Sequence, residues 1–222
     1  MCSSDLIEEV FTKYDITDVI HLAAESHVDR SIDDVVPFIH TNIFGAQSLI
    51  EVCRAHPRVR LFHISTDEVH GDIGDDDPPC TVEHGMFPSS PYAASKASAE
   101  LLIMAAMRTY RMKACVSRCT NNYGPHQAEE KLIPTIIRHA LKDEPVPIYA
   151  EGKNKRDWLY VTDHTDALET ILATDWAFWD EKVAATHPSQ PGGGGHIFHI
   201  SANSERENIE VVKMVLDLLG KP

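Results

Sequence analysis

Short apolar runs alternate with longer amphipathic stretches along the first half of the chain. The runs cover residues 19–22, 61–65 and 114–117, and residues 38–55 and 91–110 form the amphipathic stretches between them. Strands that alternate with helices in this way are typical of a parallel sheet with helices on its faces. Residues 61–64 (LFHI) are almost continuously apolar, as expected for a central strand that is buried on both sides.

The pattern changes after Asn121. Short apolar pieces at residues 146–149 and 158–161 are separated by prolines and charged turns, and a helix is expected at residues 163–173. Residues 174–195 contain four consecutive glycines and are interpreted as an insertion or loop. A strand at residues 196–200 and an amphipathic helix at residues 205–219 complete the chain.

Composition narrows the class of protein. The 222 residues are 43% hydrophobic and carry a net charge of −14, which argues against general binding to nucleic acid or to an anionic membrane. Five cysteines without a Cys-x-x-Cys pair favour reduced thiols in a cytoplasmic protein. No apolar run approaches the ~18 residues of a membrane span, and the thirteen histidines lack the paired spacing of a zinc site, so no metal is expected.

Two groups of residues carry candidate chemistry. Thr66, Asp67 and Glu68 directly follow an apolar run, where parallel sheets expose functional side chains. Tyr92 and Lys96 are four residues apart in a helical pattern and so share one face. A tyrosine base at neutral pH needs roughly 4 kcal/mol of help, and an ammonium about 4 Å away supplies about that much. The alternatives are a helix cap with a surface acid for the first group, and a surface tyrosine beside an extended lysine for the second.

Five stretches, in order, carry a family resemblance. They are residues 21–31 (HLAAESHVDRS), 65–69 (STDEV), 90–97 (SPYAASKA), 121–125 (NNYGP) and 156–161 (RDWLYV). They resemble the dTDP-glucose 4,6-dehydratases of the extended short-chain dehydrogenase/reductase family, from about residue 19 to residue 212. The fold implied is a Rossmann-like, doubly wound parallel α/β sheet that lacks its first βαβ segment, together with part of a smaller mixed α/β substrate domain. Residues 7–120 would be the C-terminal part of the NAD-binding domain. Residues 121–222 would be a truncated substrate-binding region, either separate from the sheet or interleaved with it.

The glycine pattern differs from that of a complete family member. No glycine precedes Gly45, and the cluster at residues 192–195 follows Pro191 instead of a strand, so neither can form the phosphate-binding turn. We therefore expect an internal fragment whose opening segment is absent and which is inactive by itself. Residues 1–6 match nothing in the family and are interpreted as non-native.

The resemblance implies a role for each catalytic candidate. Tyr92 would take the proton of the sugar 4-hydroxyl while a hydride leaves carbon 4 for NAD, and Lys96 would lower the pKa of Tyr92. Thr66 would orient the 4-hydroxyl. Glu68 would remove the proton from carbon 5, and Asp67 would protonate the departing 6-hydroxyl before the hydride returns to carbon 6.

Binding residues are also implied by the resemblance. The expected cofactor contacts are Leu22, Ala23, Ala24, Glu25, Ser26, Thr41, Tyr92, Lys96 and Asn122. The expected contacts to the nucleotide-sugar substrate are Ser26, Thr66, Asn121, Lys131, Leu132, the strand formed by Pro147, Ile148 and Tyr149, Arg156 and His199. His199 stands where the family usually has a diphosphate-binding asparagine, and His70 stands in place of a tyrosine. A homodimer is implied for the full-length protein.

Two other interpretations stay open. The chain could come from a 4,6-dehydratase of UDP-, CDP- or GDP-hexose, or from an epimerase or decarboxylase, although the acid Asp67 argues against the last two. It could also be a non-catalytic remnant or an NAD-sensing interaction module with the same fold.

Overall fold

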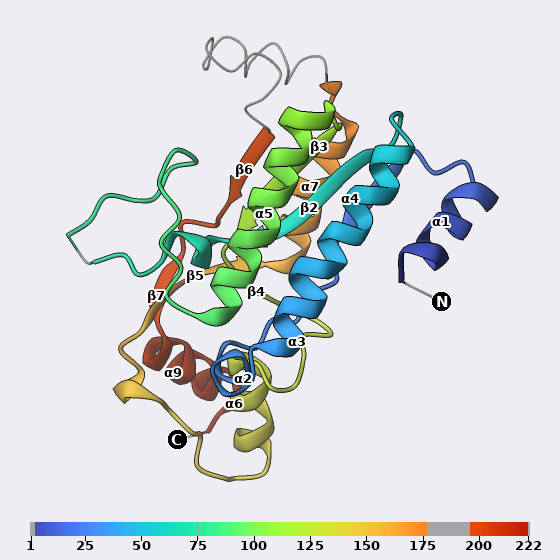
Figure 1. Cartoon of the computed structure of the whole chain (residues 1–222). Coiled ribbons are helices and arrows are strands. Elements are labelled where there is room, and N and C mark those ends of the chain that lie inside the picture. Colours follow the sequence, from blue (N-terminus) through green and yellow to red (C-terminus); the bar gives the residue numbers. More distant parts are fainter. Residues whose placement is uncertain (1–2, 75, 177–195, 222) are drawn as a thin grey trace. The chain divides into compact units, whose positions relative to one another are not determined.

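The computed structural model describes residues 3–74, 76–176 and 196–221 (Figure 1). The chain divides into two compact units. Unit 1 comprises residues 1–118 and 174–199, and unit 2 comprises residues 119–173 and 200–222. Within the described residues, no helix has both the length and the apolar character needed to cross a bilayer. The expected insertion falls mainly on residues 177–195, outside the described part of the chain.

Unit 1 is built on a four-stranded sheet in the order β1-β2-β3-β6. The strands are β1 (Asp18–His21), β2 (Arg60–Thr66), β3 (Ala114–Cys119) and β6 (His196–Ile200), of which β3 and β6 each end just beyond the unit boundary. The helices are α1 (Ser3–Lys13), α2 (Val28–Asp33), α3 (Val36–Phe38), the π-helix η1 (Ile39–Phe44), α4 (Gly45–Ala55), the 3-10 turn η2 (Asp67–His70) and α5 (Pro91–Tyr110). β1 and β2 pair in parallel with His21 opposite His63.

The core of unit 1 lies between its helices and its sheet. Helices α4 and α5 run side by side, and α5 packs against β2 (Figure 1). The apolar side chains that meet there include Ile50, Leu61, Ile103 and Val116, each buried. Because β2 is buried along almost its whole length, its continuous apolar sequence is explained, and the expectation of a central strand is confirmed.

Unit 2 has a smaller mixed sheet in the order β4-β5-β7. Its elements are β4 (Asn121–Tyr123), α6 (Leu132–Leu141), the 3-10 turn η3 (Ala150–Gly152), β5 (Lys155–Tyr160), α7 (Val161–Ala173), β7 (Glu205–Glu207) and α9 (Asn208–Leu219). β5 pairs in parallel with β4 and antiparallel with β7. Helices α6 and α9 share a core of Ile136, Val211 and Val212.

Two expected elements differ in the structure. No strand forms at residues 146–149, because Pro145 and Pro147 lack the N–H groups that a sheet ladder requires, and η3 follows instead. The helix expected from residue 205 begins at Asn208, after the short strand β7. Glu207 and Glu210 form a reciprocal capping box there, which fixes the helix start.

Candidate active site

The turn that carries the two candidate carboxylates begins where β2 ends. Thr66 caps η2: its Oγ1 accepts from the Glu68 N–H at 3.3 Å and donates to Asp67 Oδ1 at 3.2 Å. Thr66 is buried, whereas Asp67 and Glu68 are half-buried. The cap is therefore the threonine, and both carboxylates lie beyond it with part of their surface open to a ligand.

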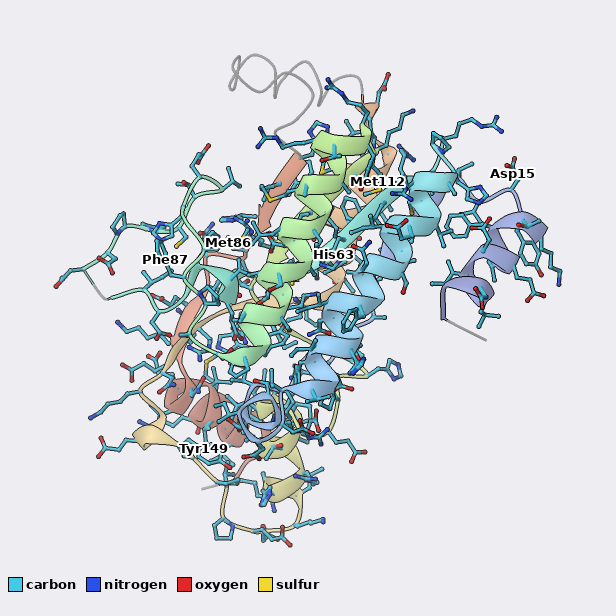
Figure 2. All side chains as sticks on the ribbon, in the orientation of Figure 1. Asp15, His63, Met86, Phe87, Met112 and Tyr149 are labelled. Atoms are coloured by element: carbon cyan, nitrogen blue, oxygen red, sulfur yellow. The ribbon has the colours of Figure 1, made fainter. Side chains whose placement is uncertain are left out.

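Gly71 ends this turn in a conformation that favours glycine. Its φ is +83°, and a Cβ at this position would lie 2.1 Å from the Phe87 carbonyl oxygen. The Phe87 N–H in turn donates to the Val69 carbonyl at 3.0 Å. The loop that leaves η2 therefore returns to it, while the Phe87 ring is 70% exposed (Figure 2).

Helix α5 presents the second group. Ser90 Oγ accepts from the Ala93 N–H at 3.1 Å and Pro91 occupies the first turn, so the predicted cap and helix start are confirmed. Tyr92 is 9% and Lys96 is 4% exposed, which excludes the alternative of a surface tyrosine beside an extended lysine. The Tyr92 ring packs edge-on against Phe38, with 6.4 Å between the centroids.

Lys96 connects helix α5 to the strand that leads into the carboxylate turn. Its Nζ donates to the Ile64 carbonyl at 2.7 Å, two residues before Thr66. Helix α5 packs against both β2 and η2. The elements that carry the five catalytic candidates therefore adjoin one another within unit 1.

Two buried histidines lie opposite each other on neighbouring strands, His21 on β1 and His63 on β2. His21 Nδ1 and His63 Nδ1 are 2.9 Å apart, so one ring donates and the other accepts. Burial, and then the charge of Lys96, lowers the pKa of His21 to about 4. The same causes, together with His21, hold the pKa of His63 well below its ordinary value. Both rings are neutral at pH 7, and His63 lies on the central strand (Figure 2).

The predicted cofactor segment follows β1 and is held by a residue that the sequence analysis missed. Asn42, 2% exposed in the π-helix η1, accepts from the Glu25 N–H at 2.9 Å and donates to the Glu25 carbonyl at 3.0 Å. It also donates to Ser95 Oγ at 2.8 Å. Of the predicted contacts, Leu22, Ala23 and Ser26 are exposed, and Ala24, Glu25 and Thr41 are half-buried. A polar residue on the buried face of an otherwise amphipathic helix is the signal that could have identified Asn42.

Ser31 is a second residue that the sequence analysis did not single out. Its Oγ accepts from the Tyr92 N–H at 3.0 Å and donates to the Val28 carbonyl at 2.6 Å. It is fully buried, and it ties α2 to the first turn of α5. Ser31 therefore fixes the backbone of Tyr92, although nothing in its spacing from Tyr92 in the sequence indicates this.

Two predicted ligand contacts lie on β4 of unit 2. Asn121 and Asn122 are half-buried. The Asn122 side chain accepts from His164 Nδ1 at 2.8 Å and donates to the Thr120 carbonyl at 3.0 Å. Burial lowers the pKa of His164, so this ring is a neutral donor. The amide of Asn122 is thus oriented from within its own unit.

The remaining predicted substrate contacts of unit 2 differ in exposure. Lys131 is the residue that precedes α6, and Leu132 packs against the α6–α9 core. Ile148 and Tyr149 are 40% and 82% exposed, but they lie in irregular backbone, so their placement on a strand was wrong (Figure 2). The Arg156 side chain is exposed on β5 and donates to the Lys155 carbonyl at 2.8 Å.

His199, the last predicted substrate contact, lies on β6 and approaches His70. The two Nε2 atoms are 3.1 Å apart. The two departures from the family pattern, 129 residues apart in sequence, are therefore in contact. Among the residues that the structure describes, no group of three histidine, cysteine, aspartate or glutamate side chains is arranged to hold a metal ion.

The chain is similar to known sugar-nucleotide 4,6-dehydratases. The family described as GDP-mannose 4,6 dehydratase matches residues 1–191. The dTDP-glucose 4,6-dehydratase of Neisseria meningitidis is 42% identical over 99% of this chain and 59% of its own length. The enzyme of the same name from Bacillus anthracis, solved in complex with NAD, is 37% identical with a TM-score of 0.84 over 99% of this chain and 62% of its own.

A third relative is solved with two ligands. The dTDP-glucose 4,6-dehydratase of Streptomyces venezuelae, with NAD and TYD bound, is 36% identical with a TM-score of 0.86, over 99% of this chain and 62% of its own. The chain thus spans about three fifths of the length of these relatives. Because the sequence match covers most of the chain and the fold agrees closely, the Rossmann-like expectation is confirmed. The chain belongs to the GDP-mannose 4,6 dehydratase family.

Proposed function

We propose that this chain carries the active-site core of an NAD-dependent dTDP-glucose 4,6-dehydratase. The reaction would convert dTDP-glucose to dTDP-4-keto-6-deoxyglucose by oxidation at carbon 4, loss of water across carbons 5 and 6, and return of the hydride to carbon 6. The observation that carries the proposal is the packing of α5, with buried Tyr92 and Lys96, against the strand and turn that present Thr66, Asp67 and Glu68. Relatives about 40% identical bear this enzyme name.

The first step requires a base at the sugar 4-hydroxyl. Tyr92 is suited to it because Lys96 follows one helical turn later, and an ammonium about 4 Å from a phenol stabilises the phenolate by about 4 kcal/mol. The Ile64 carbonyl holds the Lys96 ammonium, and the neighbouring histidines are neutral and do not compete with it in charge. Thr66 Oγ1 supplies a hydroxyl that orients the substrate hydroxyl.

The second step requires an acid and a base on the same side of the sugar. Once carbon 4 is a ketone, the proton on carbon 5 is acidic, and Glu68 would remove it. Asp67 would protonate the oxygen that leaves carbon 6. Consecutive residues of a 3-10 turn point in different directions, so the two carboxylates can address adjacent carbons without both occupying one place. Each such group contributes roughly 10²- to 10⁴-fold in rate.

NAD fits the described residues at one end. Leu22 to Ser26 follow the carboxyl end of β1 with exposed or half-buried side chains, and Asn42 holds their backbone in place at Glu25. Within unit 1, these residues together with Thr41, Tyr92 and Lys96 would hold the cofactor. When bound, NAD+ accepts the hydride from carbon 4 and returns it to carbon 6.

Deuterium transfer tests this proposal. A form of the chain completed with the expected N-terminal segment is incubated with NAD+ and dTDP-glucose that carries deuterium on carbon 4, and the product is analysed by mass spectrometry and NMR. The expected result is a product that has lost one water and carries the deuterium on carbon 6. A product with the deuterium retained on carbon 4, or a sugar epimerised at carbon 4 without loss of water, would support an epimerase instead.

The nucleotide carried by the sugar is the finer part of the proposal. The family is named for a GDP-sugar, while the relatives act by name on dTDP-glucose. We propose dTDP because the three relatives described above share it in their names. Competition among equal concentrations of dTDP-, UDP-, CDP- and GDP-glucose decides the point, and preferential consumption of any other sugar nucleotide would contradict it.

We further propose a homodimer and a cytoplasmic location. Phe44 on η1 and Leu101 on α5 are each 56% exposed, and both lie in the helical stretches that the family resemblance implies for a dimer. The described cysteines Cys53, Cys80, Cys115 and Cys119 form no disulfide with one another. Sedimentation of the protein and of its Leu101→Glu variant tests the homodimer, since the variant should dissociate. Fractionation of cells that express the protein tests the cytoplasmic location.

A further inference from the structure

A network of buried polar side chains connects α5, β3 and η2 within unit 1. It begins at Glu100, whose side chain is fully buried on α5 one helical turn beyond Lys96. Glu100 Oε2 accepts from Arg118 Nε at 3.0 Å and from Nη2 at 2.8 Å, and the Arg118 side chain is only 2% exposed on β3. Two charges buried this completely are costly unless each is well paired, so the geometry of this pair is strongly constrained.

Arg118 extends this network to the turn that carries Asp67 and Glu68. Its Nη1 lies 3.3 Å from Nε2 of His70, the last residue of η2, and His70 Nδ1 lies 3.1 Å from the Gly85 carbonyl. A guanidinium only donates and a carbonyl only accepts. His70 must therefore carry its proton on Nδ1 and present a lone pair on Nε2 to make both bonds.

His199 is the second neighbour of His70 Nε2. Its own Nε2 lies 3.1 Å from that atom. Burial, and then the nearby His70 and Arg118, lowers the pKa of His199 to about 4, while a hydrogen bond to the Cys80 backbone acts in the opposite direction. The ring is therefore neutral at pH 7, and its one N–H can serve either His70 or the Cys80 carbonyl. The other charged or titratable groups that act on the pair are Glu83, His84 and Glu100.

We propose that Glu100, Arg118, His70 and His199 are positioning residues that hold the turn of Asp67 and Glu68 at a fixed place relative to α5. They do so with His70 as the Nδ1–H tautomer, whose Nε2 lone pair faces Arg118. This polar network links the helix that carries Tyr92 and Lys96 to the last residue of the turn that carries Asp67 and Glu68. It therefore sets the distance between these two groups of catalytic candidates. His70 and His199, which both depart from the family pattern, act here as a single unit. The mechanistic meaning of this inference rests on the proposed function, because the turn it holds carries the proposed acid and base.

Nitrogen-15 NMR of the imidazoles tests the arrangement directly on the 222-residue chain at pH 7. Long-range couplings between ring protons and nitrogens distinguish the two tautomers of each histidine. The expected result is an Nδ1–H ring for His70. An Nε2–H ring at His70 would overturn the proposal, since it would place an N–H group against the Arg118 guanidinium.

A pair of variants separates positioning from packing. In His70→Gln, the side-chain oxygen can replace Nε2 as an acceptor, whereas His70→Phe keeps a ring but accepts nothing. We expect the equilibrium constant for unfolding of His70→Phe to exceed that of His70→Gln by about tenfold or more, because only the phenylalanine leaves the buried Arg118 guanidinium without this acceptor. Equal stability of the two variants would refute the proposal.

His84 provides the matched control. Its ring lies edge-on to His70 at 5.4 Å between centroids, but its side chain is exposed. His84→Gln and His84→Phe should not differ by more than about twofold in the unfolding equilibrium. In an active preparation, His70→Phe should slow loss of water more than oxidation at carbon 4. If His70 has the expected tautomer but the unsubstituted protein, completed at its N-terminus, does not dehydrate the substrate, the proposed function is wrong and the positioning role of the polar network is still supported.

Discussion

At the scale of single residues, the environment of Lys96 decides what Tyr92 can do. The ammonium is almost fully buried, donates to the Ile64 carbonyl, and lies beside two histidines that burial keeps neutral. A protonated imidazole in this place would repel the ammonium. Neutral imidazoles exert no such repulsion, so the positive charge of Lys96 is available to stabilise a Tyr92 phenolate.

Tyr92→Phe should therefore abolish turnover in an active preparation, with a loss of roughly 10²-fold or more, while substrate binding stays within about threefold. The ring keeps its packing against Phe38, so only the proton acceptor is lost. Steady-state kinetics and equilibrium binding of the nucleotide sugar measure the two effects. Tyr110→Phe, at the exposed end of the same helix, should leave both unchanged. Activity above about a tenth of normal in Tyr92→Phe would remove the tyrosine from this role.

The carboxylates are predicted to act only after carbon 4 has been oxidised. Replacing Asp67 by Asn and Glu68 by Gln in one variant should block loss of water and still allow the first hydride transfer. Reduced nicotinamide should then accumulate on the enzyme when substrate is added, and its absorbance in a stopped-flow experiment reports it. Asp76→Asn, an exposed acid in the following loop, is the control. A folded double variant that forms no reduced cofactor would show that the carboxylates also serve the oxidation.

At the scale of elements, local signals in the sequence predict much of the observed structure. Helix α5 begins at its predicted residue because Ser90 caps it and Pro91 occupies its first turn, and it ends at Tyr110 as predicted, where Arg111 adopts a left-handed conformation. β6 occupies its predicted range. The failures are equally specific. The strand expected near Pro147 does not form, because periodicity alone does not account for missing N–H donors.

The polar contacts between elements could not be predicted in this way. Asn42 joins residues 17 and 53 positions away, and Arg118 joins residues 18 and 48 positions away. Hydrophobic periodicity reports which face of an element is buried, but not which polar partners a buried residue finds across the fold. The residue types at positions 66–68, 92 and 96 were found because they adjoin strong local signals. The residues that hold them in place were missed because their partners are distant in sequence.

The two hydrogen bonds between the Asn42 side chain and the Glu25 backbone give a prediction at the scale of elements. Asn42→Ala should lower the free energy of unfolding by about 2–4 kcal/mol, because it leaves the Glu25 N–H and carbonyl and the Ser95 hydroxyl without this partner. Urea denaturation measures the change. Gln47→Ala, which removes a single side-chain bond to Glu51 on the adjoining helix, should cost less than about 1 kcal/mol. A cost for Asn42→Ala no larger than that of Gln47→Ala would contradict this prediction.

At the scale of the whole molecule, the buried histidine pair couples stability to pH. The unfolded chain binds protons at His21 with a pKa of about 6.5, whereas burial lowers the pKa of His21 in the fold to about 4. Between these values the unfolded state holds more protons, so the free energy of unfolding falls as pH falls from about 6.5 to about 4. His21 alone corresponds to about 3 kcal/mol, and His63 shifts in the same direction.

Hydrogen exchange of the β1 and β2 amides, measured from pH 7 to pH 4 and corrected for intrinsic rates, follows this loss within unit 1. The His21→Gln variant should show a shallower dependence on pH, since an amide can replace the bond to His63 without titrating. His40→Gln, at an exposed position, controls for the removal of a histidine in general. If His21→Gln and the unsubstituted chain show the same dependence of exchange on pH, the histidine pair does not cause the loss of stability in acid.

The closure of the loop at Gly71 and Phe87 bears on how such a protein can vary. The loop leaves the turn of the carboxylates covalently at Gly71, and its other end is held there because the Phe87 N–H returns to the Val69 carbonyl and the Gly85 carbonyl contacts His70. Insertions and deletions between Gly71 and Gly85 can therefore change the length of the loop without displacing that turn. Homologous proteins should therefore differ widely in length and sequence across residues 73–83. Position 71 should remain glycine among them, since a side chain there would collide with the Phe87 carbonyl and detach one end.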